Sequence, residues 1–79
     1  MSAPAGLAHW QIVFDGGSLG NPGRGYGSYR LRAPGADWAP AVRKEYGMRV
    51  TNNEAEYQTL TEALRDLAAR AADPKGVAV

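Results

Sequence analysis

The stretch that decides the fold is IVFDGGSLGNPGRGYG, residues 12–27. It begins with a short apolar run that ends in Asp15, and six glycines follow within the next twelve residues. An apolar run of this length in front of turn residues is typical of a strand buried on both faces, with Asp15 at its carboxyl end. A carboxylate buried beside such a strand is costly unless a cation or a cluster of donors pairs with it.

The residues around Asp15 allow two interpretations. The dipeptide Asp15-Gly16 is by itself typical of a turn, which would leave Asp15 without a chemical role. The number of glycines favours a binding role instead, because glycine-rich backbone lets a bulky phosphate or sugar come close. Two known phosphate-binding patterns are excluded. The glycine spacing does not fit the dinucleotide fingerprint, and no Gly-Lys-Ser/Thr follows as it would in a P-loop.

The composition narrows the class of protein. With 79 residues the chain can form one small domain. No apolar run is long enough to span a membrane, and the N-terminus lacks the pattern of a secretory signal. The absence of cysteine excludes a disulfide framework and a thiolate metal site, so we expect a cytoplasmic protein. A net charge of +1 is too small to indicate nucleic-acid binding by itself.

The order of apolar and turn residues predicts three strands and one helix. We expect a flexible N-terminus over 1–9, strands over about 10–15, 25–33 and 39–50, and an irregularity at Gly47. Short connections make the strands an antiparallel meander. A helix would begin at Thr51 and break at 73–76, and residues 77–79 would start a strand parallel to the first.

Basic residues gather in the second and third predicted strands. Their positions favour a solvated sheet face over a track for phosphates. The group consists of Arg30, Arg32, Arg43, Lys44 and Arg49.

The start of the helix is the second informative stretch. Thr51 and Glu54 have the spacing of a capping box, in which each side chain satisfies a free backbone donor of the other residue. At about 100° per residue, Glu56 lies about 50° from the centre of the apolar stripe and should point toward the sheet, whereas Asp66 falls on the wet side. An acid in the first turn can also be half exposed and favoured by the helix dipole. Alternatively, Glu56 and Asp15 converge on a cation such as Mg²⁺ or Mn²⁺. The stripe consists of Tyr57, Leu60, Leu64, Leu67 and Ala71.

Two motifs in this order, DGGSLGNPG at 15–23 and TNNEAEY at 51–57, resemble the N-terminal half of a type 1 ribonuclease H. The match covers about residues 11–79, and TNNEAEY looks more like the compact bacterial, archaeal and retroelement-type members. The resemblance implies a ribonuclease H-like fold of the α/β class, with a five-stranded mixed sheet flanked by helices. Residues 10–79 would supply three antiparallel strands, one long helix and the stub of a fourth strand.

The resemblance also implies a function, namely metal-dependent hydrolysis of the RNA strand of RNA/DNA hybrids by two divalent ions, Mg²⁺ or Mn²⁺. It places the first two catalytic, metal-binding carboxylates on Asp15 and Glu56. Amide side chains suit hybrid contact because they can read a 2′-hydroxyl. The family's third and fourth acids and its catalytic-loop histidine would lie beyond Val79, and His9 does not match that histidine. The substrate-contacting positions would be Gly16, Gly17, Asn21, Asn52 and Asn53.

Three functions are consistent with these observations. The first is a ribonuclease H half that needs its C-terminal half for activity. The second is a half-domain that binds nucleic acid or oligomerises without cutting. The third is a nucleotide-handling protein, since actin-like ATPases open with a similar strand, acid and glycine turn, but that class needs a second phosphate loop and a longer chain. The open edge of the first strand predicts a homo-oligomer or a complementary C-terminal half as partner.

Overall fold

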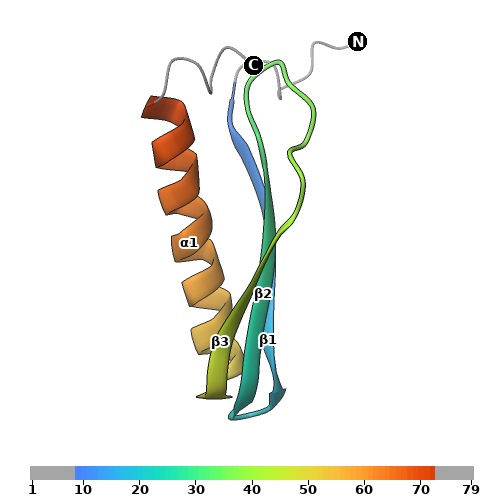
Figure 1. Cartoon of the computed structure of the whole chain (residues 1–79), viewed down its shortest axis with the longest axis vertical. Coiled ribbons are helices and arrows are strands. Elements are labelled where there is room, and N and C mark those ends of the chain that lie inside the picture. Colours follow the sequence, from blue (N-terminus) through green and yellow to red (C-terminus); the bar gives the residue numbers. More distant parts are fainter. Residues whose placement is uncertain (1–8, 73–79) are drawn as a thin grey trace.

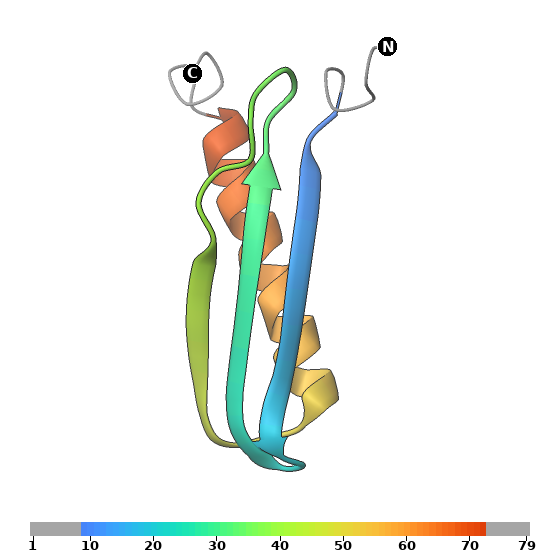
Figure 2. The same ribbon diagram turned by 90° about the vertical axis from the view of Figure 1, so that its right-hand side faces the viewer.

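A meander of three strands followed by one long helix makes up residues 9–72, the part of the chain that this computed structural model describes. The elements are β1 (Gln11–Gly20), β2 (Gly23–Arg32), β3 (Val42–Val50) and α1 (Asn52–Ala72). The strand order is β1-β2-β3, and both pairs are antiparallel. α1 packs along one face of this sheet (Figures 1 and 2). The predicted meander is confirmed, and the class is α+β.

The first strand is longer than the sequence predicted, and this moves Asp15 from its end to its middle. The ladder between β1 and β2 runs from Gln11 opposite Arg32 to Gly20 opposite Gly23 without a shift. The first left-handed glycine is Gly20, with φ of 95°, directly before the two-residue turn. Glycine permits a turn but does not impose one, so the glycines after Asp15 continue the strand.

The expectation that this strand is buried on both faces is wrong. Val13 is 55% exposed and Phe14 38% exposed. The reason is that, among residues 9–72, α1 covers one face of the sheet and β1 has a neighbouring strand on one side only (Figure 2). Asp15 is exposed as well, so its carboxylate needs no buried counter-charge.

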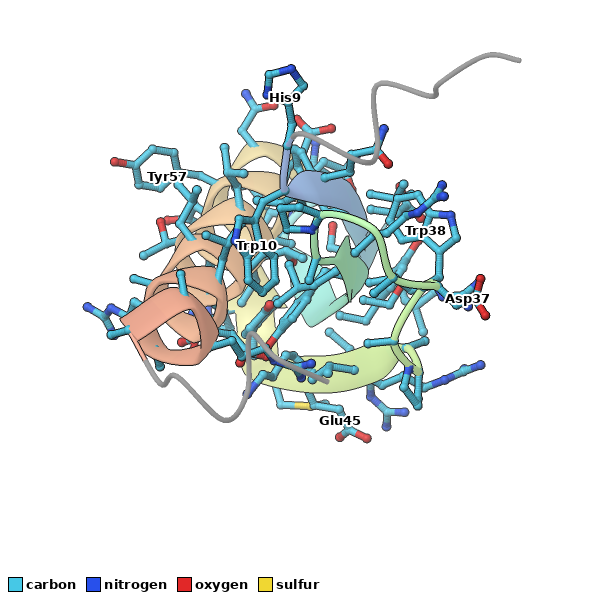
Figure 3. The ribbon with its side chains drawn as sticks, turned by 90° about the horizontal axis from the view of Figure 1, so that it is seen from above. His9, Trp10, Asp37, Trp38, Glu45 and Tyr57 are labelled. Atoms are coloured by element: carbon cyan, nitrogen blue, oxygen red, sulfur yellow. The ribbon has the colours of Figure 1, made fainter. Side chains whose placement is uncertain are left out.

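The helix turns a different face to the sheet from the predicted apolar stripe. Tyr57 is 76% exposed and points away from the sheet (Figure 3), and Leu64 is 50% exposed, although both belong to that stripe. The true buried face is rotated by about 100° from the stripe's centre. It carries three small side chains, Ala55, Thr59 and Ala63.

Close approach of the helix to glycines of the sheet explains this choice of face. A Cβ atom at Gly27 of β2 would overlap the hydroxyl oxygen of Thr59. The Thr59 hydroxyl also bonds the Tyr46 hydroxyl at 2.8 Å and donates to the Ala55 carbonyl at 2.7 Å. At so short a separation, small residues pack where large apolar ones would collide.

The hydrophobic core lies between the sheet and the C-terminal half of α1. Tyr29 and Leu31 of β2 are buried with Ala63 of α1, and four partly buried side chains pack around them. The Tyr29 hydroxyl donates to a carboxylate oxygen of Asp66 at 2.8 Å. Asp66 is therefore half-buried against the sheet, and the prediction that it faces solvent is wrong because the helix is rotated. The four partly buried side chains that pack around the core are Trp10, Ile12, Val42 and Leu67.

A further carboxylate contact fixes the end of the helix. Arg70 donates to both oxygens of Asp66, with the shorter Nε–Oδ1 distance at 2.9 Å. These bonds lower the pKa of Asp66. Burial, then the bond to Asp66, raises the pKa of Tyr29 to about 12.

The irregularity predicted at Gly47 is confirmed. Gly47 has φ of 111°, and the register between β2 and β3 shifts on both sides of Gly25, its partner. The expectations for residues 1–8, for the helix break and for the strand over 77–79 lie outside the described residues.

Candidate functional site

The candidate site lies where β1 touches the first turns of α1, and Gly16 makes that contact possible. A Cβ atom added at Gly16 would lie 2.7 Å from the Ala55 carbonyl oxygen and 2.9 Å from the Glu56 Cα atom. Both obstacles are backbone atoms, so only glycine fits without moving the helix. The contact brings the backbone next to Asp15 directly against the backbone of Glu56.

The two predicted carboxylates reach this point from different elements. Gly16 faces the helix, so Asp15 projects from the opposite face of the sheet, since successive side chains of a strand alternate. Glu56 lies on the β1 side of α1, beside a shallow hollow that Phe14, Asn53 and Leu60 also line. The two carboxylates therefore flank the open edge of β1, one from each side of the sheet.

Both carboxylates are exposed, so the expectation that Glu56 points into the sheet is wrong, because the rotated helix buries Ala55 and Thr59 instead. Neither carboxylate has a hydrogen-bond or ion-pair partner among residues 9–72, where the single ion pair joins Arg70 to Asp66. A carboxylate with all its lone pairs free at a strand edge can accept a cation or water-mediated contacts without breaking an existing bond.

Two of the predicted substrate-contacting residues also hold the site together. The Asn52 side-chain carbonyl accepts from the Ser18 backbone N–H at 2.8 Å and from the Ser18 hydroxyl at 3.1 Å. The Asn21 side-chain carbonyl accepts from the Asn52 backbone N–H at 3.1 Å. Both asparagines are exposed, and their NH₂ groups have no partner within 9–72. The carbonyl ends fix the turn to the helix, while the NH₂ ends are left to donate outward.

Ser18 is a positioning residue that the sequence reasoning missed. Its hydroxyl contacts both the Asn52 side chain and the Gly20 carbonyl. The sequence signal for this role is a single hydroxyl within a glycine-rich segment, because a small donor there can hydrogen-bond to the turn that follows.

The helix start has the predicted capping box. The Thr51 hydroxyl accepts from the Glu54 backbone N–H at 3.1 Å, and the Glu54 carboxylate accepts from the Thr51 N–H at 2.9 Å. With Asn21 bonded to the N–H of Asn52, three backbone donors at this end are satisfied. Asn53, the residue that follows Asn52, is exposed.

Gly17 differs from the other predicted contact residues because it is buried. A Cβ atom there would lie 2.8 Å from the Tyr26 hydroxyl oxygen and 3.5 Å from the Asn52 side-chain oxygen. The Tyr26 side chain lies across this glycine, so a ligand would reach the Gly17 backbone only after Tyr26 moves.

The donor set fits a hard divalent cation. Mg²⁺ prefers oxygen ligands and is commonly held by one or two carboxylates together with waters and substrate phosphates. Asp15 and Glu56 provide the carboxylates. In the described range, 9–72, no group of three or more Asp, Glu, His or Cys side chains is placed to hold a metal. Any further ligands would come from waters, from bound phosphates or from groups outside residues 9–72.

The comparisons with known proteins add no relative to this picture. No protein-family model, no curated protein and no solved structure matches the chain. Within residues 9–72 no helix is both long enough and apolar enough to cross a membrane.

Proposed function

We propose that the chain is the part of a type 1 ribonuclease H domain that carries the first two catalytic carboxylates, in a ribonuclease H-like fold. The observation that carries the proposal is the contact of Gly16 with Ala55 and Glu56. It accounts for a glycine directly after Asp15, because any side chain there would meet backbone atoms of Ala55 and Glu56. Both motifs of the resemblance thus meet at one point of the molecule.

In this proposal each group has a definite role. Asp15 and Glu56 would hold Mg²⁺ or Mn²⁺, and the metal would supply activation of the attacking water and stabilisation of the leaving oxygen. The NH₂ groups of Asn21 and Asn52 donate to 2′-hydroxyls and base edges in the minor groove of the hybrid. Asn53 stands beside them on the same exposed turn.

The open edge of β1 points to a partner. In the described sheet β1 pairs only with β2, and its other side carries unpaired backbone donors and acceptors beside the exposed Val13 and Phe14. Exposed edges pair readily with another strand. We propose that a second copy or a complementary C-terminal half pairs here and completes the metal site.

A second candidate is a half-domain that binds nucleic acid without cutting it. It is favoured by the donor set, because only two carboxylates meet at the candidate site within residues 9–72. The two candidates differ in whether binding depends on the acids. A nuclease needs both carboxylates for cleavage, whereas a binding module retains its affinity without them.

The experiment is cleavage of a labelled RNA/DNA hybrid with Mg²⁺ or Mn²⁺, beside Asp15→Asn, Glu56→Gln and the control Glu45→Gln. Glu45 is an exposed acid of β3 away from the β1 edge. Solution mass is recorded on the same samples. We expect cleavage, by this chain alone or with an added C-terminal half, that both site variants abolish and the control retains. Hybrid binding without cleavage in either case would refute the nuclease and support the binding module.

A further inference from the structure

Two arginines of β2 and a tryptophan of the following loop form a cluster on the sheet face away from α1. The guanidinium carbons of Arg30 and Arg32 lie 6.0 Å and 5.8 Å from the centre of the Trp38 ring. This is the range in which a cation is attracted to an aromatic face. We call these three residues the arginine–tryptophan cluster.

Backbone hydrogen bonds hold each member in place. The Nε atoms of Arg30 and Arg32 donate to the carbonyl oxygens of Ala39 and Ala36, at 3.1 Å and 2.9 Å. Trp38 forms an isolated antiparallel bridge with Arg32, which puts their side chains on the same face. The loop carbonyls thus bind the Nε atom of each arginine, and the two outer guanidinium nitrogens point elsewhere.

Among residues 9–72 the outer nitrogens of both guanidinium groups have no hydrogen-bond partner, and their positive charge has no counter-ion. Within residues 9–72 no carboxylate pairs with either arginine, although Asp37 lies exposed in the same loop and Asp15 lies on the same face. Arg43 of β3, opposite Ser28, adds a third positive charge to this face. Two guanidinium groups fixed in advance lose little side-chain freedom when an anion binds, which favours binding.

The five basic residues predicted as one group divide between different places. Lys44 is half-buried on the helix side, near enough to Asp66 to lower that residue's pKa. Arg49 lines a groove between the end of β3 and α1. Only Arg30, Arg32 and Arg43 share the outer face, so the solvated-face interpretation does not describe the whole group.

We propose that the arginine–tryptophan cluster binds phosphates of a nucleic-acid strand that lies across the outer sheet face. The inference rests on the proposed function, since Asp15 projects from this same face. Val13 pairs with Arg30 and Asp15 with Ser28, so Asp15 and Arg30 are diagonal neighbours at about 7–8 Å. A strand presented to Asp15 would therefore pass within reach of the cluster. An acidic peptide would offer the arginines the same negative charge, so the test below includes polyglutamate as the alternative occupant.

The test measures affinity for a fluorescent RNA/DNA hybrid in EDTA, so that no cleavage occurs, over a series of KCl concentrations. The variants are Arg30→Gln and Arg32→Gln, and the control is Arg65→Gln, which removes the same charge from the exposed face of α1. Each cluster variant should weaken binding at low salt and reduce the slope of log K against log [KCl] by about 1, as expected for a lost phosphate contact. The control should leave the slope unchanged.

The fluorescence of Trp38 reports binding without any change to the arginines, so it does not depend on whether the arginine variants fold. In a Trp10→Phe background Trp38 is the sole indole, because the chain has two tryptophans. Its emission should shift on adding the hybrid and not on adding polyglutamate. An unchanged slope in both cluster variants, a silent Trp38, or an equal response to polyglutamate would each overturn the proposal. Cleavage that depends on Asp15 while the cluster variants bind normally would refute this inference and leave the proposed function standing.

Discussion

Replacing Gly16 by alanine tests the contact on which the candidate site depends. The added Cβ would lie 2.7 Å from the Ala55 carbonyl oxygen, and ordinary contact begins at 3.4 Å, so α1 must retreat by about 0.7 Å. Forcing an extra carbon into a packed contact costs about 1–3 kcal/mol. The lower chain entropy of unfolded alanine returns about 0.4–1 kcal/mol, because Gly16 does not have a positive φ. The net destabilisation is then about 1–2 kcal/mol.

The assay is thermal unfolding followed by far-UV circular dichroism. For a domain of this size, such a loss lowers Tm by about 5–15 °C. Gly17→Ala is the matched control, because its new Cβ meets side-chain atoms and no backbone: the end of the Tyr26 side chain at 2.8 Å and, in ordinary contact, the Asn52 oxygen at 3.5 Å. We expect its Tm to stay near that of the wild type. Equal melting of both variants and the wild type would refute the close approach of helix and strand, and with it the main support for the proposed function.

Four further results are expected. Thr51→Ala should destabilise the protein by about 1 kcal/mol through loss of the cap, whereas Thr51→Ser should keep most of it; equal urea midpoints for the two would contradict the observed capping box. The pKa of Asp66 is lowered by folding, so its stabilisation is present above the unfolded value of 3.8 and is lost as pH falls through the folded value; in acid melts, the Tm gap between wild type and Asp66→Asn should therefore close. The pKa of Tyr29 is raised, so its contribution holds below pH 10 and is lost as pH rises toward 12, and Tyr29→Phe should flatten the alkaline fall in stability. Light scattering should give a mass above that of one chain, because the β1 edge is open, and a monomer at high concentration would contradict this.

The sequence predicted the order and type of the elements because those depend on local patterns. The meander follows from short connections, and the cap at Thr51 follows from the identity of two residues three positions apart. Neither depends on contacts between distant parts of the chain. The left-handed Gly47 likewise follows from a residue that interrupts an otherwise continuous strand.

The wrong predictions about the helix share one physical cause, which is the close approach of α1 to a glycine-rich sheet. The apolar stripe through Tyr57 and Leu64 would be the buried face if the helix needed large side chains for packing. Against Gly16 and Gly27 the helix needs small side chains. The spacing of small residues produces little periodic hydrophobicity in the sequence. The same rotation brings Asp66 to Tyr29 and takes it out of solvent.

For the candidate site, the sequence indicated which residues matter better than it indicated how they are arranged. Asp15 and Glu56 are brought to one edge of β1 by the Gly16 contact. Their sharing of a cation stays a prediction. The internal use of the Asn21 and Asn52 carbonyls was not foreseen, because it depends on a hairpin turn meeting a helix start 31 residues away in the chain.

That bond between Asn21 and the first turn of α1 has a consequence for the order of folding. The helix start is complete only when the β1–β2 turn is already in place beside it. A helix that relies on a distant cap gains less from forming early, so hairpin closure should precede helix consolidation in the folding transition state. The two halves of the described chain would then form as a single cooperative unit, with the side chains of Asn21 and Asn52 coupling the turn to the helix.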